Sequence, residues 1–135
     1  MSEIAEEIYK KSFSKIVEHP FSIASMIKEF TSNYGVVEER ENKVFSSGCG
    51  AVMEFSFDVV KNIDNVSSIV FSFFLHSEGN KLNIDVKGGL KTLLNVKEKT
   101  FNEFYLNERC PEIRPKARYE IKKIASEIED RINKI

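Results

Sequence analysis

The sequence contains no tryptophan and only two cysteines, and the scarcity of cysteine narrows the chemistry available to the protein. Cys49 and Cys110 belong to no CxxC or Cys/His pattern, so we expect no zinc site and no other metal. A reduced pair is favoured over a disulfide between them, which is the alternative. Cys49 lies between two glycines, but no base or cation beside it would activate the thiol, so we expect a packing role.

Charge of one sign and long apolar runs are also missing. The chain has 20 Lys and Arg against 21 Asp and Glu, a net charge of −1, which argues against a nucleic-acid partner. No apolar run approaches the roughly 20 residues that a membrane helix needs, so no membrane insertion is expected. The acidic N-terminus lacks an apolar signal core, and a cytoplasmic location is the expectation. With 135 residues, the chain 1–135 is predicted to form a single domain.

Eleven phenylalanines are present instead, and several of them alternate with polar residues. Residues 53–59, 66–76 and 82–86 show the period of two that is typical of strands. The last two segments flank the turn Ser77-Glu78-Gly79-Asn80, which predicts a β-hairpin. Residues 36–41 and 43–47 are predicted as two shorter strands around a polar turn.

Gly88 and Gly89 are predicted to end the sheet. Beyond them, the apolar residues from Leu90 to Tyr105 fit a helix, with a last strand over residues 93–97 as the alternative. A loop is expected from Asn107 to Pro115.

The C-terminal segment from Arg114 onward has the pattern of one long amphipathic helix. Spacings of three and four residues put the apolar side chains on one face, which needs an apolar surface to cover. The stripe consists of Ile121, Ile124, Ile128, Ile132 and Ile135.

The N-terminal residues 3–18 allow two interpretations. Their apolar spacing fits one helix, and a short strand over 3–10 followed by a helix over 12–18 fits almost as well. Pro20 is well placed to open a further helix, which Gly35 would end.

Four stretches together resemble the START-like helix-grip superfamily, which includes relatives of the birch pollen allergen, polyketide cyclases and lipid-transfer domains. They are KIVEHPFSIASMIKEF, SSGCGAVMEFSF, IVFSFFLHSEGNKLNIDVKG and the isoleucine-striped helix. The resemblance implies an α+β fold, in which an antiparallel curved sheet is gripped by the long C-terminal helix, with two short helices near the N-terminus.

The resemblance also implies a cavity between the sheet and the C-terminal helix, holding an apolar ligand. The candidate ligand-binding residues are Met53, Phe55, Phe57, Ile69, Phe71, Phe73, Leu82, Ile84, Ile121, Ile124 and Ile128. The same side chains would also serve as an ordinary filled core, and periodicity does not separate the two interpretations.

Polar residues offer little evidence of catalysis. Glu54 and Asp58 share one face of a strand, but they alternate away from the phenylalanines, so we expect them to be solvated. His19 and His76 lack a second ligand at metal spacing and are expected at the surface. No catalytic residue and no cofactor is therefore predicted.

The basic residues near the C-terminus form one cluster, which we interpret as a solvated helix face. It consists of Arg109, Arg114, Lys116, Arg118, Lys122 and Lys123. The isoleucine stripe spans only about two heptads, too few to predict a coiled coil, although a homodimer of whole domains stays open.

These observations favour a carrier or sensor of a hydrophobic small molecule, lipid or fatty-acid-like, over an enzyme. One alternative is an interaction module with a filled core that forms a homodimer. The other is a cyclase- or hydrolase-like enzyme of the same superfamily, for which Tyr34, His76 and Arg109 are the only loose candidates.

Overall fold

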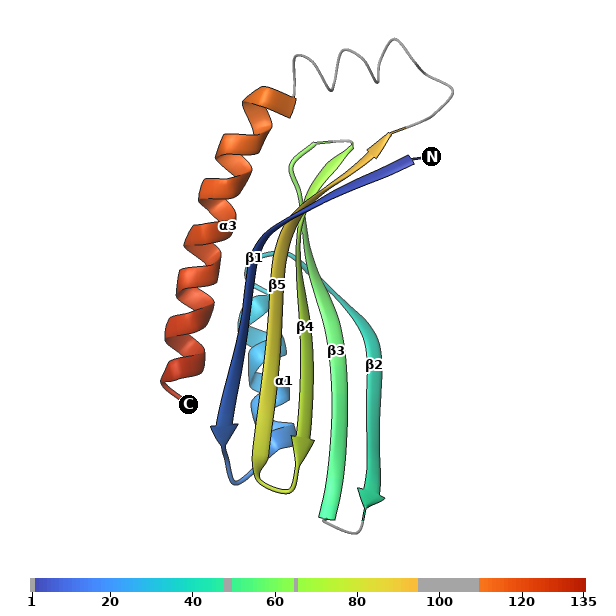
Figure 1. The fold of residues 1–135 in the computed structure, drawn as a ribbon, viewed down its shortest axis with the longest axis vertical. Helices are drawn as coiled ribbons and strands as arrows, with labels where there is room; N and C mark the ends of the chain where they lie inside the picture. The colour runs from blue at the N-terminus through green and yellow to red at the C-terminus, as the bar shows by residue number, and fades with distance from the viewer. Residues whose placement is uncertain (1, 48–49, 65, 95–109) are drawn as a thin grey trace.

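One five-stranded antiparallel sheet and two helices make up the part of the chain that the computed structural model describes, residues 2–47, 50–64, 66–94 and 110–135 (Figure 1). The strand order is β1-β5-β4-β3-β2, and every neighbouring pair is antiparallel. The strands are β1 (Ser2–Ile16), β2 (Val36–Ser47), β3 (Gly50–Asn62), β4 (Ser67–Glu78) and β5 (Lys81–Leu94). The helices are α1 (Pro20–Thr31) and α3 (Cys110–Asn133).

The protein is α+β, but the predicted pair of short helices near the N-terminus is wrong. Only α1 forms there, and the expected helix over residues 12–18 lies largely within β1. The reason is a β-bulge between Glu7 and Tyr9, where the register with β5 shifts by one residue. The extra residue interrupts the period of two, which made a fifteen-residue strand look like a helix in the sequence.

Bulges and glycines also account for two further corrections. The predicted polar turn at Glu41 does not exist, because β2 is continuous and accommodates one extra residue between Glu39 and Glu41. Gly88 and Gly89 do not end the sheet, since β5 continues to Leu94, and the helix expected to start at Leu90 is wrong in this part. Glycines inside a strand mark close backbone approach as well as strand ends.

The C-terminal helix begins earlier than expected. The predicted loop to Pro115 is wrong over its last residues, because α3 starts at Cys110 and holds Pro115 in its second turn. Near a helix N-terminus a proline removes few hydrogen bonds, so the helix tolerates it. The expectations for residues 95–109 and for Cys49 lie outside the described residues.

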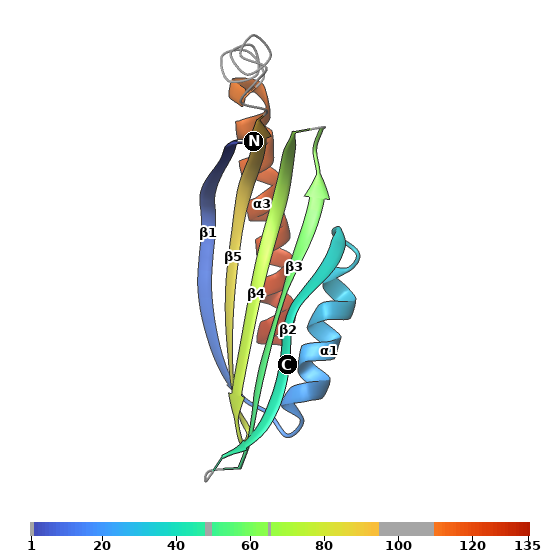
Figure 2. The ribbon, with the colours of Figure 1, turned by 90° about the vertical axis from the view of Figure 1, so that its right-hand side faces the viewer.

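Both helices cover the same face of the sheet and share one apolar core (Figure 2). α1 packs on β3, and α3 packs on β1 and β5. The isoleucine stripe of α3 is buried from Ile121 to Ile132, as its spacing predicts. The β4–β5 hairpin is confirmed, with Gly79 in its turn at a φ of 57°.

Polar contacts fasten α3 to the edge strand β1. Glu6 pairs with two arginines of α3, since Arg114 Nε lies 3.1 Å from Oε2 and Arg118 Nη2 lies 2.5 Å from Oε1. Nearer the C-terminal end of α3, the Tyr9 hydroxyl donates a hydrogen bond of 2.5 Å to Glu129 Oε1. This bond lowers the pKa of Glu129, and burial together with the same bond raises the pKa of Tyr9.

Replacing Tyr9 by Phe is expected to lower the free energy of unfolding at neutral pH by about 1 kcal/mol, the net worth of a partly exposed hydrogen bond to a carboxylate. Because folding lowers the pKa of Glu129, this stabilisation is present above the ordinary glutamate range and is lost as the pH falls through the folded value. The difference between the two proteins should therefore narrow on acidification. Urea unfolding followed by circular dichroism at neutral and acid pH measures it.

The control is Tyr119→Phe, because Tyr119 is 73% exposed on α3, the helix that carries Glu129. An equal loss for Tyr9→Phe at both pH values would show that the hydroxyl acts through packing, not through Glu129.

Candidate functional site

All eleven candidate ligand-binding residues lie on the helix-covered face and belong to the single apolar core. None of them is more than 6% exposed. Phe57 and Phe73 stack with their ring centroids 4.8 Å apart, and Phe55 contacts Phe57 at 5.4 Å. Burial of this kind is common to a packed core and to a ligand-lined core. The two cases differ at the edge of the core, where a ligand would enter.

Close contact between α3 and the sheet is set by Gly88. A methyl group at this position would lie 2.7 Å from the Phe71 ring and 3.1 Å from the Cγ2 atom of Ile121. The missing side chain thus lets Ile121 settle directly over β5. This contact anchors the helix at one side of the sheet, while the other side of α3 faces the end of β3 and the α1–β2 connection.

A cleft of about 750 Å³ opens on that second side of α3. Its walls come from the α1–β2 connection, the end of β3 and one flank of α3, and its apolar lining includes Ile124. The lining residues are Asn33, Tyr34, Lys61, Pro115, Lys116, Tyr119, Glu120, Lys123, Ile124 and Glu127. Ile124 is the one candidate ligand-binding residue among them, so the cleft reaches the margin of the predicted site.

Two polar contacts cross this cleft and tie α3 to the rest of the fold. The Tyr34 hydroxyl donates a 2.6 Å hydrogen bond to Glu127 Oε2, and Lys61 forms an ion pair with Glu120. Burial, followed by the bond to Glu127, raises the pKa of Tyr34 to about 12, so the hydroxyl stays a donor at physiological pH. These contacts are exposed and each contributes little to stability.

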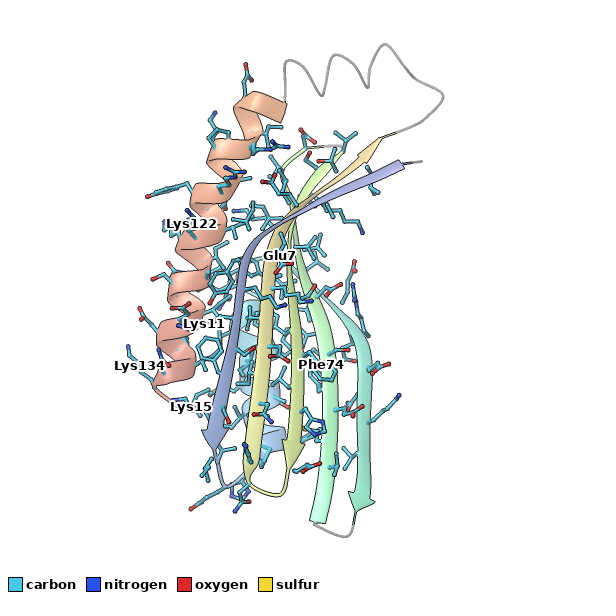
Figure 3. All side chains as sticks on the ribbon, in the orientation of Figure 1. Glu7, Lys11, Lys15, Phe74, Lys122 and Lys134 are labelled. Atoms are coloured by element: carbon cyan, nitrogen blue, oxygen red, sulfur yellow. The ribbon has the colours of Figure 1, made fainter. Side chains whose placement is uncertain are left out.

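The basic cluster is divided among three environments. Arg114 and Arg118 pair with Glu6, Lys116 and Lys123 line the cleft, and Lys122 projects from the outer side of α3 (Figure 3). Arg109 lies outside the described residues. All five described members of the cluster are exposed, so the prediction of a solvated helix face is confirmed for them, and two of these exposed arginines also pair with Glu6.

Sequence reasoning missed most of the cleft residues, although one signal was present. Lys116, Glu120, Lys123 and Glu127 follow each other at spacings of four, three and four, forming a charged stripe on α3 beside the isoleucines. Their partners on the other wall, Tyr34 and Lys61, stand at the ends of elements and carry no such periodicity.

The remaining candidate residues are not brought together. Tyr34 bonds to α3 on the covered face, whereas His76 lies on the open face, with Nδ1 3.6 Å from Glu54 Oε1. The expectation that Glu54 and Asp58 are both solvated is wrong for Asp58, which is only 6% exposed and pairs with Arg40. His19 precedes α1 at its N-cap position and is exposed, as expected.

In the part of the chain that the structure describes, no helix is both long and apolar enough to cross a membrane. Within the same residues, no group of three or more His, Cys, Asp and Glu side chains has a geometry suited to a metal ion.

No family model matches the chain, and no curated protein matches its sequence.

Proposed function

We propose that the protein binds a fatty-acid-like small molecule, with the apolar part against the core beneath α3 and the anionic head at the rim of the cleft. The observation that carries the proposal is the cleft itself, whose lining combines five charged side chains with Ile124, a member of the apolar core. Binding sites for small molecules are typically concave, with a few polar groups at defined positions around an apolar floor.

The charge of the rim favours an anionic head group. The cleft is lined by three lysines and two glutamates, a surplus of one positive charge. Lys61 is engaged by Glu120, and Tyr34 occupies Glu127, which leaves Lys116 and Lys123 without an ion pair among the described residues. Two ammonium groups at the rim would neutralise a carboxylate, while an apolar chain would meet Ile124.

The position of α3 supports this proposal. A long C-terminal helix lies across one face of an antiparallel sheet (Figure 2), and exposed polar contacts cross the cleft on its second side. Because such contacts are individually weak, they can exchange for contacts to a ligand at the rim while Ile121 stays packed against Gly88. Carriage or sensing needs such reversible exchange and no covalent chemistry.

Lys123→Glu is expected to weaken binding of a fluorescent probe, 11-(dansylamino)undecanoic acid, by about tenfold, because it replaces a head-group cation with a like charge. The measurement is the rise in dansyl fluorescence on titration with purified protein, followed by displacement with unlabelled palmitate. The protein has no tryptophan, so its own emission interferes little.

The matched control is Lys122→Glu, which makes the same charge change one residue away on the outer face of α3 (Figure 3). Equal weakening by both variants would reduce the effect to net charge. Absence of saturable probe binding to the unmodified protein would refute the proposal and favour a filled core.

A further inference from the structure

The open face of the sheet is the face opposite to both helices, and it carries a carboxylate that is buried. This carboxylate belongs to Asp58 of β3. The residue is only 6% exposed, although no helix covers this face in the described structure. Its Oδ2 atom pairs with Arg40, but its Oδ1 atom is buried without a hydrogen-bond partner. Native proteins rarely leave such an oxygen unpaired, because its desolvation costs about 1–3 kcal/mol or more.

A β-bulge brings Arg40 to Asp58. Arg40 is the extra residue of β2, between Glu39 and Glu41 where the register with β3 shifts. Bulges often direct a side chain toward a functional position and are frequent beside binding sites. The guanidinium reaches Asp58 from an exposed position, since its side chain is 62% exposed, and so forms one wall above the carboxylate.

The sheet bends around this position to form a hollow of about 410 Å³. The bulge of β1 faces Gly88 and Gly89 of β5, and there both strands turn toward the side away from α3 (Figure 1). Residues of all five strands line the hollow, including Glu7 from one edge strand and Glu38 from the other. A second depression of about 300 Å³ adjoins it and is lined in part by Phe74, which projects on this face (Figure 3).

Four polar side chains are common to both depressions: Arg40, Asp58, Ser72 and Lys87. The last three are direct neighbours across β3, β4 and β5, since Asp58 pairs with Ser72 and Ser72 with Lys87. Neither the Ser72 hydroxyl nor the Lys87 ammonium has a partner among the described residues. This row of three side chains therefore places Asp58 Oδ1, an acceptor without a donor, near the Lys87 ammonium, a cation without an anion.

Apolar side chains complete the lining next to this row. Val60, Val70 and Leu93 belong to the larger hollow, on the same face of the sheet. A ligand that suits these surroundings carries an ammonium group for Asp58 Oδ1, a carboxylate for Lys87 and a short apolar side chain. A molecule with only an ammonium group would leave Lys87 without an anion, and one with only a carboxylate would leave Asp58 Oδ1 without a donor.

We infer that this hollow is a binding site for a zwitterionic amino acid with an apolar side chain, held by Asp58, Ser72 and Lys87. The site is independent of the cleft beneath α3, because the sheet separates the two. Its ligand donates to the buried carboxylate oxygen and accepts from Lys87, while its side chain covers the valines.

The test is titration of the full chain with L-leucine, followed by isothermal calorimetry and by amide shifts in two-dimensional NMR. Saturable binding is expected, with shifts concentrated in β3, β4 and β5 around Ser72 and Val70. N-acetyl-L-leucine lacks the ammonium group and 3-methylbutylamine lacks the carboxylate, so each should bind about tenfold more weakly or not at all.

Two variants separate the site from the fold. Asp58→Asn keeps the size of the side chain, and Lys87→Met alters an exposed residue, so folding of the second does not depend on a buried group. Each should weaken L-leucine binding by about tenfold. The control is Lys10→Met, because Lys10 is the register neighbour of Lys87 on β1 but lines neither depression.

Three results would overturn the inference: no saturation by L-leucine, binding of either analogue as tight as that of L-leucine, or unchanged affinity of Lys87→Met for L-leucine. A water molecule on Asp58 Oδ1 would then account for the unpaired oxygen.

Discussion

Phe57→Ala is expected to lower the free energy of unfolding by about 3–5 kcal/mol, the usual cost of removing a fully buried aromatic ring from a core. Phe57 is fully buried and stacks on Phe73 with an angle of 9° between the ring planes. Removing it takes away a neighbour of both Phe55 and Phe73 in the centre of the sheet. Urea unfolding followed by far-ultraviolet circular dichroism measures the loss.

Phe74→Ala is the matched control, because it removes the same kind of ring from β4, next to the residue Phe73 that pairs with Phe57. Phe74 is 40% exposed on the open face (Figure 3), so its loss should cost less than about 1 kcal/mol. Similar losses for both variants would contradict the assignment of the covered face. A loss well under 2 kcal/mol for Phe57→Ala would indicate that the core around this ring is loosely filled.

Gly88→Val is expected to destabilise the protein by about 1–3 kcal/mol, because it forces a branched side chain between the sheet and α3. Even the first carbon would lie 2.7 Å from the Phe71 ring and 3.1 Å from Ile121, both of which are buried. The helix must move outward to relieve this contact. Chemical unfolding gives the energy, and hydrogen exchange of the α3 amides reports the displacement.

Asn83→Val places the same new residue on the open face of the same strand. Asn83 pairs with His76 and is half-buried, with no helix above it, so the substitution should change stability by less than about 1 kcal/mol. If Gly88→Val left both stability and α3 exchange unchanged, Ile121 would not be the anchor of the helix.

The elements that were predictable from sequence are those whose pattern is local and uninterrupted. In β3, β4 and β5, apolar residues occupy every second position, and they are buried because the pleat places alternate residues on one face. Phe55, Phe71 and Leu82 are examples, one from each strand. The burial of the isoleucine stripe of α3 was predictable for the same reason, because residues three and four positions apart share one face of a helix.

The errors occur where one residue or one close contact interrupts such a pattern. Glu7 and Tyr9 flank a bulge, so β1 has the appearance of a helix in the sequence. Gly88 and Gly89 resemble a strand end, but their role is to admit Ile121 on one side and the β1 backbone at Glu6 on the other. Both depend on residues distant in the chain, which a local pattern does not contain.

By itself, the sequence determined which side chains are buried on the covered face and that α3 has an apolar stripe to bury. Alternation and helical spacing are properties of neighbouring residues, so they need no tertiary structure. Only the tertiary structure decided that Tyr34 and Lys61 meet α3 around a cleft, and that Arg40 buries Asp58 on the opposite face. Those contacts arise from strand order, bulges and the bend of the sheet, which set distances between residues that are far apart in the chain.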